Sequence, residues 1–202
     1  MGHAEMFTGI VQSVGRVRAI EPREGDIRVS VDSGDLDLSD MRPGDSIALS
    51  GVCLTAIVVN ATSFCADVSV ETLSRTTLGR MTVGSRVNLE KPLRLADRIG
   101  GHLVSGHVDG LGELLAIQAD ARSQRWKLAL PDELSRYVAA KGSICIDGVS
   151  LTVNEVAGSR FGVNLIPHTL GVTTFSERNV GDHMNVEVDL IARYVERLHA
   201  SD

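Results

Sequence analysis

The sequence predicts an all-β protein made of two homologous antiparallel barrels in tandem, followed by a C-terminal α-helix. The first observation is an internal repeat: residues 44–90 align with residues 141–187 without a gap, and 16 of the 47 aligned positions are identical. Unrelated chains would share roughly three such positions. The second observation is that each copy contains short apolar runs separated by Gly, Asp and Pro turns. The third is a tail with helical spacing and no counterpart in the first copy.

The strands of the first half are expected where apolar or β-branched residues alternate with polar ones. In chain order they cover residues 9–20, 27–31, 46–49, 54–59, 64–70 and 86–89, with a Ser-Gly turn between the third and the fourth. The Thr-rich residues 71–78 are expected to form one or two helical turns. The constant offset of 97 residues carries this pattern into the second half, where residues 132–140 add another short helix.

The domain boundaries follow from the repeat and from the tail. We expect an N-terminal barrel over residues 6–99, a C-terminal barrel over residues 100–188 and an oligomerisation helix over residues 189–202. Asp189 is a candidate N-cap, and the apolar residues that recur at helical spacing are Leu190, Ile191, Tyr194, Val195 and Leu198. Such a face is covered either by its own barrel or by copies of the chain. Residues 1–5 have no counterpart in the second copy and are left out of this prediction.

The composition excludes several classes of partner. The net charge is −6 and aromatic residues make up 3% of the chain, whereas nucleic-acid binders combine a basic surface with stacking rings. The most apolar stretch, residues 47–61, is too short to span a bilayer. Cys53, Cys65 and Cys145 lack zinc-site spacing, and an odd number of cysteines without a secretory leader is typical of a reduced, cytoplasmic protein. We therefore expect no nucleic acid, membrane or metal partner.

The strongest local signal is the frame GVCLT at residues 51–55, which recurs as GVSLT at residues 148–152. A glycine at a strand edge lets the backbone approach a ligand, and the Cys or Ser shares one strand face with the Thr two residues later. A single such cysteine is often a buried core residue. Its recurrence as Ser150 opposite Cys53 favours a site in each half.

Two histidines lie in GGHLVSGH. His102 and His107 are five residues apart, so on a strand they would face opposite sides and form a poor metal pair. His107 aligns with Ile10, and its place after Gly106 makes it a candidate base, with a purely structural histidine as the alternative.

Each half also repeats a Thr-rich segment, ETL in the first and HTL in the second, followed by a further Thr. Either these segments are capped short helices, or their N-terminal N–H groups hold polar ligand edges. No phosphate loop, dinucleotide fingerprint or hydrolase spacing is present, so no cofactor is expected.

Taken together, these motifs resemble the riboflavin synthase family over nearly the whole chain from Met6. The resemblance rests on MFTGIV (6–11), SGVCLT (50–55), ETL (71–73), GGHLVSGHVDG (100–110), KGSICIDGVSLTV (141–153), LIPHTL (165–170) and NVEVDLIARYVERL (185–198). It implies two six-stranded Greek-key barrels, a homotrimer, and an active site where the N-terminal barrel of one subunit faces the C-terminal barrel of another.

The resemblance also implies the reaction, the final step of riboflavin biosynthesis. Two molecules of 6,7-dimethyl-8-ribityllumazine exchange a four-carbon unit and give riboflavin and 5-amino-6-ribitylamino-pyrimidinedione, without cofactor or metal. An alternative on the same fold is a non-catalytic lumazine- or flavin-binding antenna protein, which would keep ligand contacts and lose reactive residues. A generic flavin- or nucleotide-binding double barrel is a further alternative.

The residues that match the family's sites fall in both halves. The implied catalytic residues are Ser46, Cys53, His107, Ser150 and Asp189. The first lumazine site is implied at Gly9, Ile10, Val11, Cys53, Leu54, Thr55, Asp67, Val68, Ser69, Val70, Glu71 and Thr72. The second is implied at Gly106, His107, Val108, Lys141, Ser150, Leu151, Thr152, Leu165, Ile166, Pro167, His168, Thr169 and Leu170.

A dismutation needs two like pockets whose reacting ends differ. The repeat shows these differences as pairs at the offset of 97: Ile10/His107, Cys53/Ser150, Asp67/Asn164, Glu71/His168 and Pro92/Asp189. We interpret His107 as a base for the acidic 7-methyl group of one lumazine, and Cys53 or Ser46 as the group that acts at C7 of the other.

Overall fold

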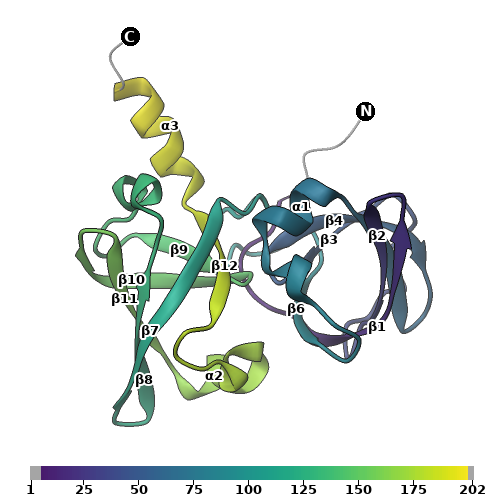
Figure 1. The fold of residues 1–202 in the computed structure, drawn as a ribbon, viewed down its shortest axis with the longest axis horizontal. Helices are drawn as coiled ribbons and strands as arrows, with labels where there is room; N and C mark the ends of the chain where they lie inside the picture. Colours follow the sequence, from purple (N-terminus) through teal and green to yellow (C-terminus); the bar gives the residue numbers. More distant parts are fainter. Residues whose placement is uncertain (1–5, 200–202) are drawn as a thin grey trace.

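Two closed barrels, each of six antiparallel strands, lie side by side in the computed structural model, which describes residues 6–199 (Figure 1). Helix α3 (Leu190–His199) follows the second barrel and extends away from it. The predicted all-β fold of two tandem barrels and a C-terminal helix is confirmed. Residues 1–5 and 200–202, including the end of the predicted helix over residues 189–202, lie outside the described residues.

The first barrel closes in the order β1-β2-β5-β4-β3-β6. Strands β3, β4 and β5 pair consecutively, and β6 returns beside β3, which makes a Greek key. Helix α1 and a 3-10 turn connect β5 to β6. The bounds are β1 Ser13–Arg23, β2 Asp26–Asp32, β3 Ser46–Leu49, β4 Val52–Val59, β5 Ser63–Val68, α1 Val70–Arg75, η1 Thr77–Arg80 and β6 Arg86–Glu90.

The second barrel repeats this order, β7-β8-β11-β10-β9-β12, and most of its elements begin 97 residues after their counterparts. One 3-10 turn, η2, is added between β8 and β9, where a short helix was predicted. The bounds are β7 Gly110–Asp120, β8 Ser123–Ala129, η2 Asp132–Tyr137, β9 Ser143–Ile146, β10 Val149–Ala157, β11 Arg160–Leu165, α2 Pro167–Val172, η3 Thr174–Glu177 and β12 His183–Val188.

Several predicted strand limits in the first half differ from the structure, two of them because of competing contacts. The strand predicted from residue 9 begins at Ser13, because the carbonyl of Gly9 bonds to Ser150 of the other half instead of continuing the strand ladder. The strand predicted to reach residue 70 ends at Val68, because Ser69 caps α1: its hydroxyl accepts a hydrogen bond from the N–H of Thr72 at 3.2 Å. Local propensity alone did not show either competing contact.

Each barrel encloses its own apolar core, and a third, smaller cluster lies where the barrels meet. The second core contains Trp126 against Phe175, with ring centroids 5.2 Å apart. The cluster at the junction consists of Phe7, Ala48, Val104 and Cys145, with Cys53 packed against it. Burial of this cluster holds the two barrels in one arrangement.

Two equivalent asparagines, Asn88 and Asn185, join the barrels by reciprocal hydrogen bonds. Asn88 Nδ2 donates to the carbonyl of Asp147, and Asn185 Nδ2 donates to the carbonyl of Ser50, each at 2.8 Å. Their Oδ1 atoms accept backbone N–H groups across the junction, from Thr174 and from Thr77 respectively. The two halves are thus related by a pseudo-two-fold axis, and both polar atoms of each buried asparagine side chain have a hydrogen-bond partner.

No helix among residues 6–199 is long and apolar enough to cross a membrane.

Candidate functional site

In the GVCLT and GVSLT frames the Cys or Ser and the Thr lie on the outer face of a barrel, whereas the Leu between them is buried. Along β4 the side chains of Val52, Leu54 and Ala56 are buried, whereas Cys53 is half-buried and Thr55 is exposed. In β10 Ser150 is half-buried and Thr152 is exposed in the same way. Ser46 pairs with Thr55 across the β3–β4 ladder and shares its outer face. A ligand at these residues would lie against the outside of a barrel.

A cavity of about 350 Å³ opens beside Cys53. Strand β4 supplies Cys53, helix α1 supplies Glu71 and Thr72, and the segment before β7 supplies Gly106, His107 and Val108. The cavity is therefore built from both halves of the chain. It brings the predicted thiol and the predicted imidazole to one place.

The two segments that precede the barrels cross over. Phe7 and Val104, which are equivalent in the repeat, pair at the crossing: each N–H donates to the other's carbonyl, at 2.7 and 3.0 Å. Beyond the crossing, the carbonyl of Gly9 accepts the N–H of Ser150 at 2.7 Å, and the carbonyl of Gly106 accepts the N–H of Cys53 at 2.9 Å. Each segment thus lies on the barrel of the other half.

This crossing places each segment against the barrel opposite to the one with which the sequence grouped it. The sequence placed Gly9, Ile10 and Val11 with Cys53, but Gly9 binds Ser150 and Val11 packs against the second core. It placed Gly106–Val108 with Ser150, but Gly106 binds Cys53 and Val108 packs against the first core. The repeat shows which residues are equivalent and not which barrel they contact, so the exchange was invisible in the alignment.

Glycine is required at both crossing points. Gly9 and Gly106 have φ of +73° and +78°, a region that other residues adopt at a cost. A Cβ on Gly106 would lie 2.5 Å from the Cβ of Cys53, and one on Gly9 would lie 2.6 Å from the Cβ of Ser150. Backbone and strand are therefore in direct contact beside each candidate reactive residue.

A second cluster forms around Ser150, and it includes a histidine that the sequence reasoning set aside. His102 Nδ1 lies 2.6 Å from Ser150 Oγ, and its Nε2 is buried without a hydrogen-bond partner among residues 6–199. Burial lowers the pKa of His102, and the nearby Asp189 carboxylate partly opposes this. Asp189 also caps α3, since its Oδ1 accepts the N–H of Ile191 at 2.9 Å. His102 is thus hydrogen-bonded to Ser150 and lies close enough to Asp189 for the carboxylate to influence its pKa.

His102 was missed because the prediction treated residues 100–107 as a strand with two faces. The structure has bends and loop there, with an isolated bridge at Val104 and no continuous strand. The sequence feature that could have indicated His102 is GGH, because the two glycines before the histidine allow the backbone to approach another strand closely. A Cβ on Gly101 would lie 2.6 Å from the Cβ of Ser150.

Other predicted binding residues have side chains that are buried or already paired. Leu54, Val68, Leu151 and Leu165 are buried in the barrel cores. Asp67 is held by Arg28 in a two-pronged ion pair of 2.8 and 2.9 Å, and these bonds lower the pKa of the Asp67 carboxyl. The four buried residues can still bind a ligand through their backbone N–H and C=O groups.

The remaining residues of the predicted lists lie at element ends. Val70, Glu71 and Thr72 occupy the first turn of α1, and their equivalents Pro167, His168 and Thr169 begin α2 after Ile166. Leu170 is half-buried against the second core. Lys141 is an exposed turn residue with a φ of +69°.

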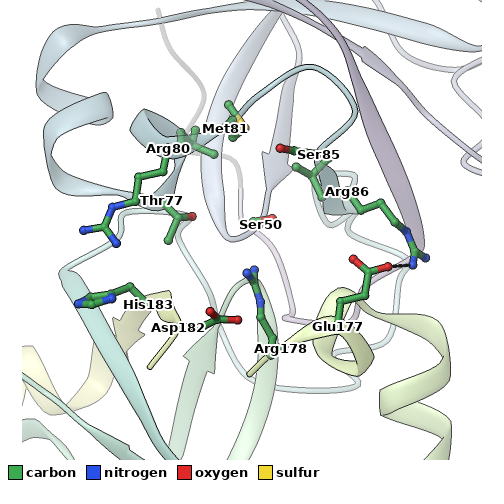
Figure 2. A pocket seen from close by; sticks show the side chains of 12 residues that line it. Ser50, Thr77, Arg80, Met81, Ser85, Arg86, Glu177, Arg178, Asp182 and His183 are labelled. Atoms are coloured by element: carbon green, nitrogen blue, oxygen red, sulfur yellow. Dashed lines mark hydrogen bonds and ion pairs between the residues drawn. The ribbon is translucent and has the colours of Figure 1, made fainter. Parts of the chain in front are cut away.

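A larger cleft, of about 380 Å³, lies between the barrels and contains none of the predicted residues. Figure 2 shows arginines of both halves and carboxylates of the second half around it. Arg86 is paired with Glu177, and Arg178 is paired with the buried Asp147 at 2.7 Å. The Arg86–Glu177 pair bridges the barrels, whereas Arg178 and Asp147 both belong to the second half. Within the described residues no group of three or more His, Cys, Asp and Glu side chains is arranged to hold a metal ion.

Comparison with known proteins agrees with the repeat. The lumazine binding domain family matches the chain twice, at residues 8–92 and 105–189. The chain is 46% identical over 193 residues to the riboflavin synthase of Photobacterium phosphoreum, covering 96% of this chain and 88% of that one. It is 44% identical over 203 residues to that of Mycobacterium tuberculosis strain H37Rv, covering 97% and 99%. The corresponding protein of Bacillus subtilis strain 168 is 37% identical, covering 98% and 92%.

Solved structures show the same fold. LumP in complex with 6,7-dimethyl-8-(1'-D-ribityl) lumazine superposes with a TM-score of 0.80 at 23% identity, over 91% of this chain and 99% of that one. LumP in complex with riboflavin gives a TM-score of 0.82 at 24% identity over the same shares. Given the two matched domains and the near full-length relatives, the chain belongs to the riboflavin synthase family.

Proposed function

We propose that this protein is a riboflavin synthase, which converts two molecules of 6,7-dimethyl-8-ribityllumazine into riboflavin and 5-amino-6-ribitylamino-pyrimidinedione. The family membership supports the reaction. The observation that carries it is that one frame, used twice, holds two chemically different clusters: Cys53 with His107 on one barrel, and Ser150 with His102 and Asp189 on the other. Two identical lumazine molecules would bind at equivalent positions on the two barrels and meet different reactive groups there.

The proposed chemistry uses these groups for proton transfer and for attack on the ring. A base removes a proton from the 7-methyl group of one lumazine, whose ring delocalises the resulting negative charge. The carbanion joins the second lumazine, which gives up its four-carbon unit and leaves as the pyrimidinedione. Neutral His102 can accept a proton through Ser150, and His107 can do so beside Cys53. Much of the rate enhancement would come from holding the two rings face to face.

The proposed ligand contacts follow the crossed arrangement. On the first barrel they are Ser46, Cys53, Leu54, Thr55, Asp67, Val68, Ser69, Val70, Glu71 and Thr72, completed by Gly106, His107 and Val108. On the second they are Lys141, Ser150, Leu151, Thr152, Leu165, Ile166, Pro167, His168, Thr169, Leu170 and Asp189, completed by Gly9, Ile10 and Val11. The close backbone approach at Gly9 and Gly106 supports this assignment.

The same proposal includes a homotrimer held by α3. The helix is tied to its own barrel along one side, where Glu196 accepts from Arg136 and Tyr137 at 2.8 Å. Its apolar side chains are left open: Ile191 is 64% exposed, Tyr194 65% and Leu198 85%. Copies of α3 packed around a three-fold axis would bury them. A cytoplasmic location is supported by Cys53, Cys65 and Cys145, none of which forms a disulfide.

The reaction is tested with the substrate alone. Protein dialysed against chelator and given pure 6,7-dimethyl-8-ribityllumazine should form riboflavin, detected by its fluorescence, and an equal amount of the pyrimidinedione. A requirement for added metal or nicotinamide would contradict the proposal. A binding protein of the antenna class would instead copurify with a fluorophore and form no riboflavin.

A further inference from the structure

Two buried carboxylates that take no part in the proposed chemistry lie at the ends of equivalent strands. Glu90 ends β6 and Glu187 lies near the end of β12, and each is 5% exposed. Neither forms an ion pair with a side chain among the described residues. Both accept hydrogen bonds from the segments that cross between the barrels.

Glu187 is connected to Cys53 through a single residue. Its Oε1 accepts the N–H and the hydroxyl of Ser105 at 2.6 and 2.7 Å, and its Oε2 accepts the N–H of Gly106 at 2.8 Å. The carbonyl of Gly106 then accepts the N–H of Cys53 at 2.9 Å. The carboxylate is in the second barrel and the cysteine is in the first.

Glu90 makes the same connection in the opposite direction. Its Oε1 accepts the N–H and the hydroxyl of Thr8 at 2.7 and 2.8 Å, and its Oε2 accepts the N–H of Gly9 at 3.1 Å. The carbonyl of Gly9 accepts the N–H of Ser150 at 2.7 Å. Here the carboxylate is in the first barrel and the serine is in the second.

An ionised carboxylate is suited to this position. Each crossing segment points three donors at one side chain, and a carboxylate offers only acceptors. Burial raises the pKa of both Glu90 and Glu187, while the bonds from Thr8, Ser105 and the glycines oppose that rise. A glutamine of the same shape would place an N–H group against a backbone N–H and push the segment away.

Resting on the proposed function, we propose that Glu90 and Glu187 are positioning residues, each of which sets the geometry of the site on the opposite barrel. Glu187 places Gly106 and His107 against Cys53. Glu90 places Gly9 and Ile10 against Ser150. A perturbation in one barrel is therefore felt at the reactive residue of the other.

The test compares Glu187→Gln with Glu90→Gln in the full chain, each being the matched control for the other. Amide ¹H–¹⁵N spectra should show Glu187→Gln shifting the signals of Gly106 and Cys53 while those of Gly9 and Ser150 stay in place. Glu90→Gln should give the reverse pattern. Riboflavin formation should fall about 10- to 100-fold in both, mainly in kcat, because a displacement of about 1 Å at the reacting groups has an effect of this size.

A thiol measurement gives a second readout. In a Cys65→Ser background, the rate of alkylation of Cys53 by iodoacetamide should change in Glu187→Gln and not in Glu90→Gln, since Cys145 is 1% exposed and does not compete. If a glutamine variant does not fold, Ser105→Ala and Thr8→Val remove one donor each and should give the same crossed pattern at smaller size.

The proposal is overturned if the folded variants perturb both sites equally, perturb only their own barrel, or turn over like the wild type. A wild-type protein that forms no riboflavin would refute the proposed function. The crossed pattern of amide shifts would still decide the positioning roles, so the two failures can be told apart.

Discussion

Replacing Gly106 by alanine tests whether close contact between the crossing segment and β4 is needed for turnover. Gly106 has a φ of +78°, and an added Cβ would lie 2.5 Å from the Cβ of Cys53 and 2.9 Å from its backbone N. Ordinary contacts begin at 3.4 Å, so the segment must retreat by about 1 Å, a distance that typically lowers a reaction rate about 100-fold. His107 moves with Gly106, because it is the next residue in the chain.

The stability cost has two parts that a control separates. The left-handed conformation costs an alanine roughly 1–2 kcal/mol, and the overpacking adds about 1–3 kcal/mol. Gly158 has a φ of +61° and nothing within 4 Å of its added Cβ. Gly158→Ala should therefore lose only the first part of the free energy of unfolding and keep full activity.

The assay is riboflavin formation by the two variants, together with urea unfolding of each. We expect Gly106→Ala to be about 100-fold slower than Gly158→Ala at saturating substrate. Activities within twofold of each other would refute the reasoning, since the steric conflict would then be relieved without moving the site. If Gly106→Ala and Gly158→Ala have equal free energies of unfolding, the added methyl group is accommodated by a movement of β4 that does not reduce stability, and the crossing segment stays in place.

Three further predictions concern single groups. Cys53→Ser and His107→Ile make the two halves alike, and each should reduce turnover by about 10²–10⁴-fold with substrate binding retained. The control Cys65→Ser should behave as wild type. Wild-type turnover in the first two variants, or a loss of binding alone, would contradict the donor and acceptor asymmetry. Leu198→Glu, on the exposed face of α3, should give monomers by light scattering, and a stable trimer would show that the helix is not the contact. Burial lowers the pKa of His102 from its usual 6.5, so the unfolded chain binds the proton more readily than the folded protein as the pH falls. The free energy of unfolding should therefore decrease as the pH is lowered from 6.5. His102→Asn should remove this part of the decrease, measured by urea unfolding between pH 7 and pH 5.

Much of the fold could be predicted because it rests on local patterns used twice. The alternation of buried and exposed residues in β4, the Ser-Gly turn before it and the helical spacing of the tail are each contained in a few neighbouring residues. The gap-free repeat then assigned the same elements to the second half. Strand ends were less predictable, since Ser69 left β5 to cap α1 and the carbonyl of Gly9 bonds to the other barrel instead of continuing β1.

The candidate site shows the same division. The reactive types at Cys53, Ser150 and His107 stood out because the repeat places different chemistry on a common frame. His102 did not stand out because a strand was expected at a segment that is a loop. Glu187 did not stand out because the equivalent residue in the first half is also a glutamate, so the pair shows no difference between the halves.

By itself the sequence determined the number of domains, the strand pattern and the family, because each is encoded by neighbours along the chain or by the constant offset. It also predicted reactive residues at the two ends. Only the tertiary structure decided which residues share a site. The crossing of Phe7 and Val104 exchanges the two segments between barrels, and it is held by contacts between residues more than 80 positions apart. An alignment of the halves shows which residues are equivalent, but it is the same whether each segment contacts its own barrel or the other one. The segments that contact Cys53 and Ser150 could therefore be assigned only from the three-dimensional structure.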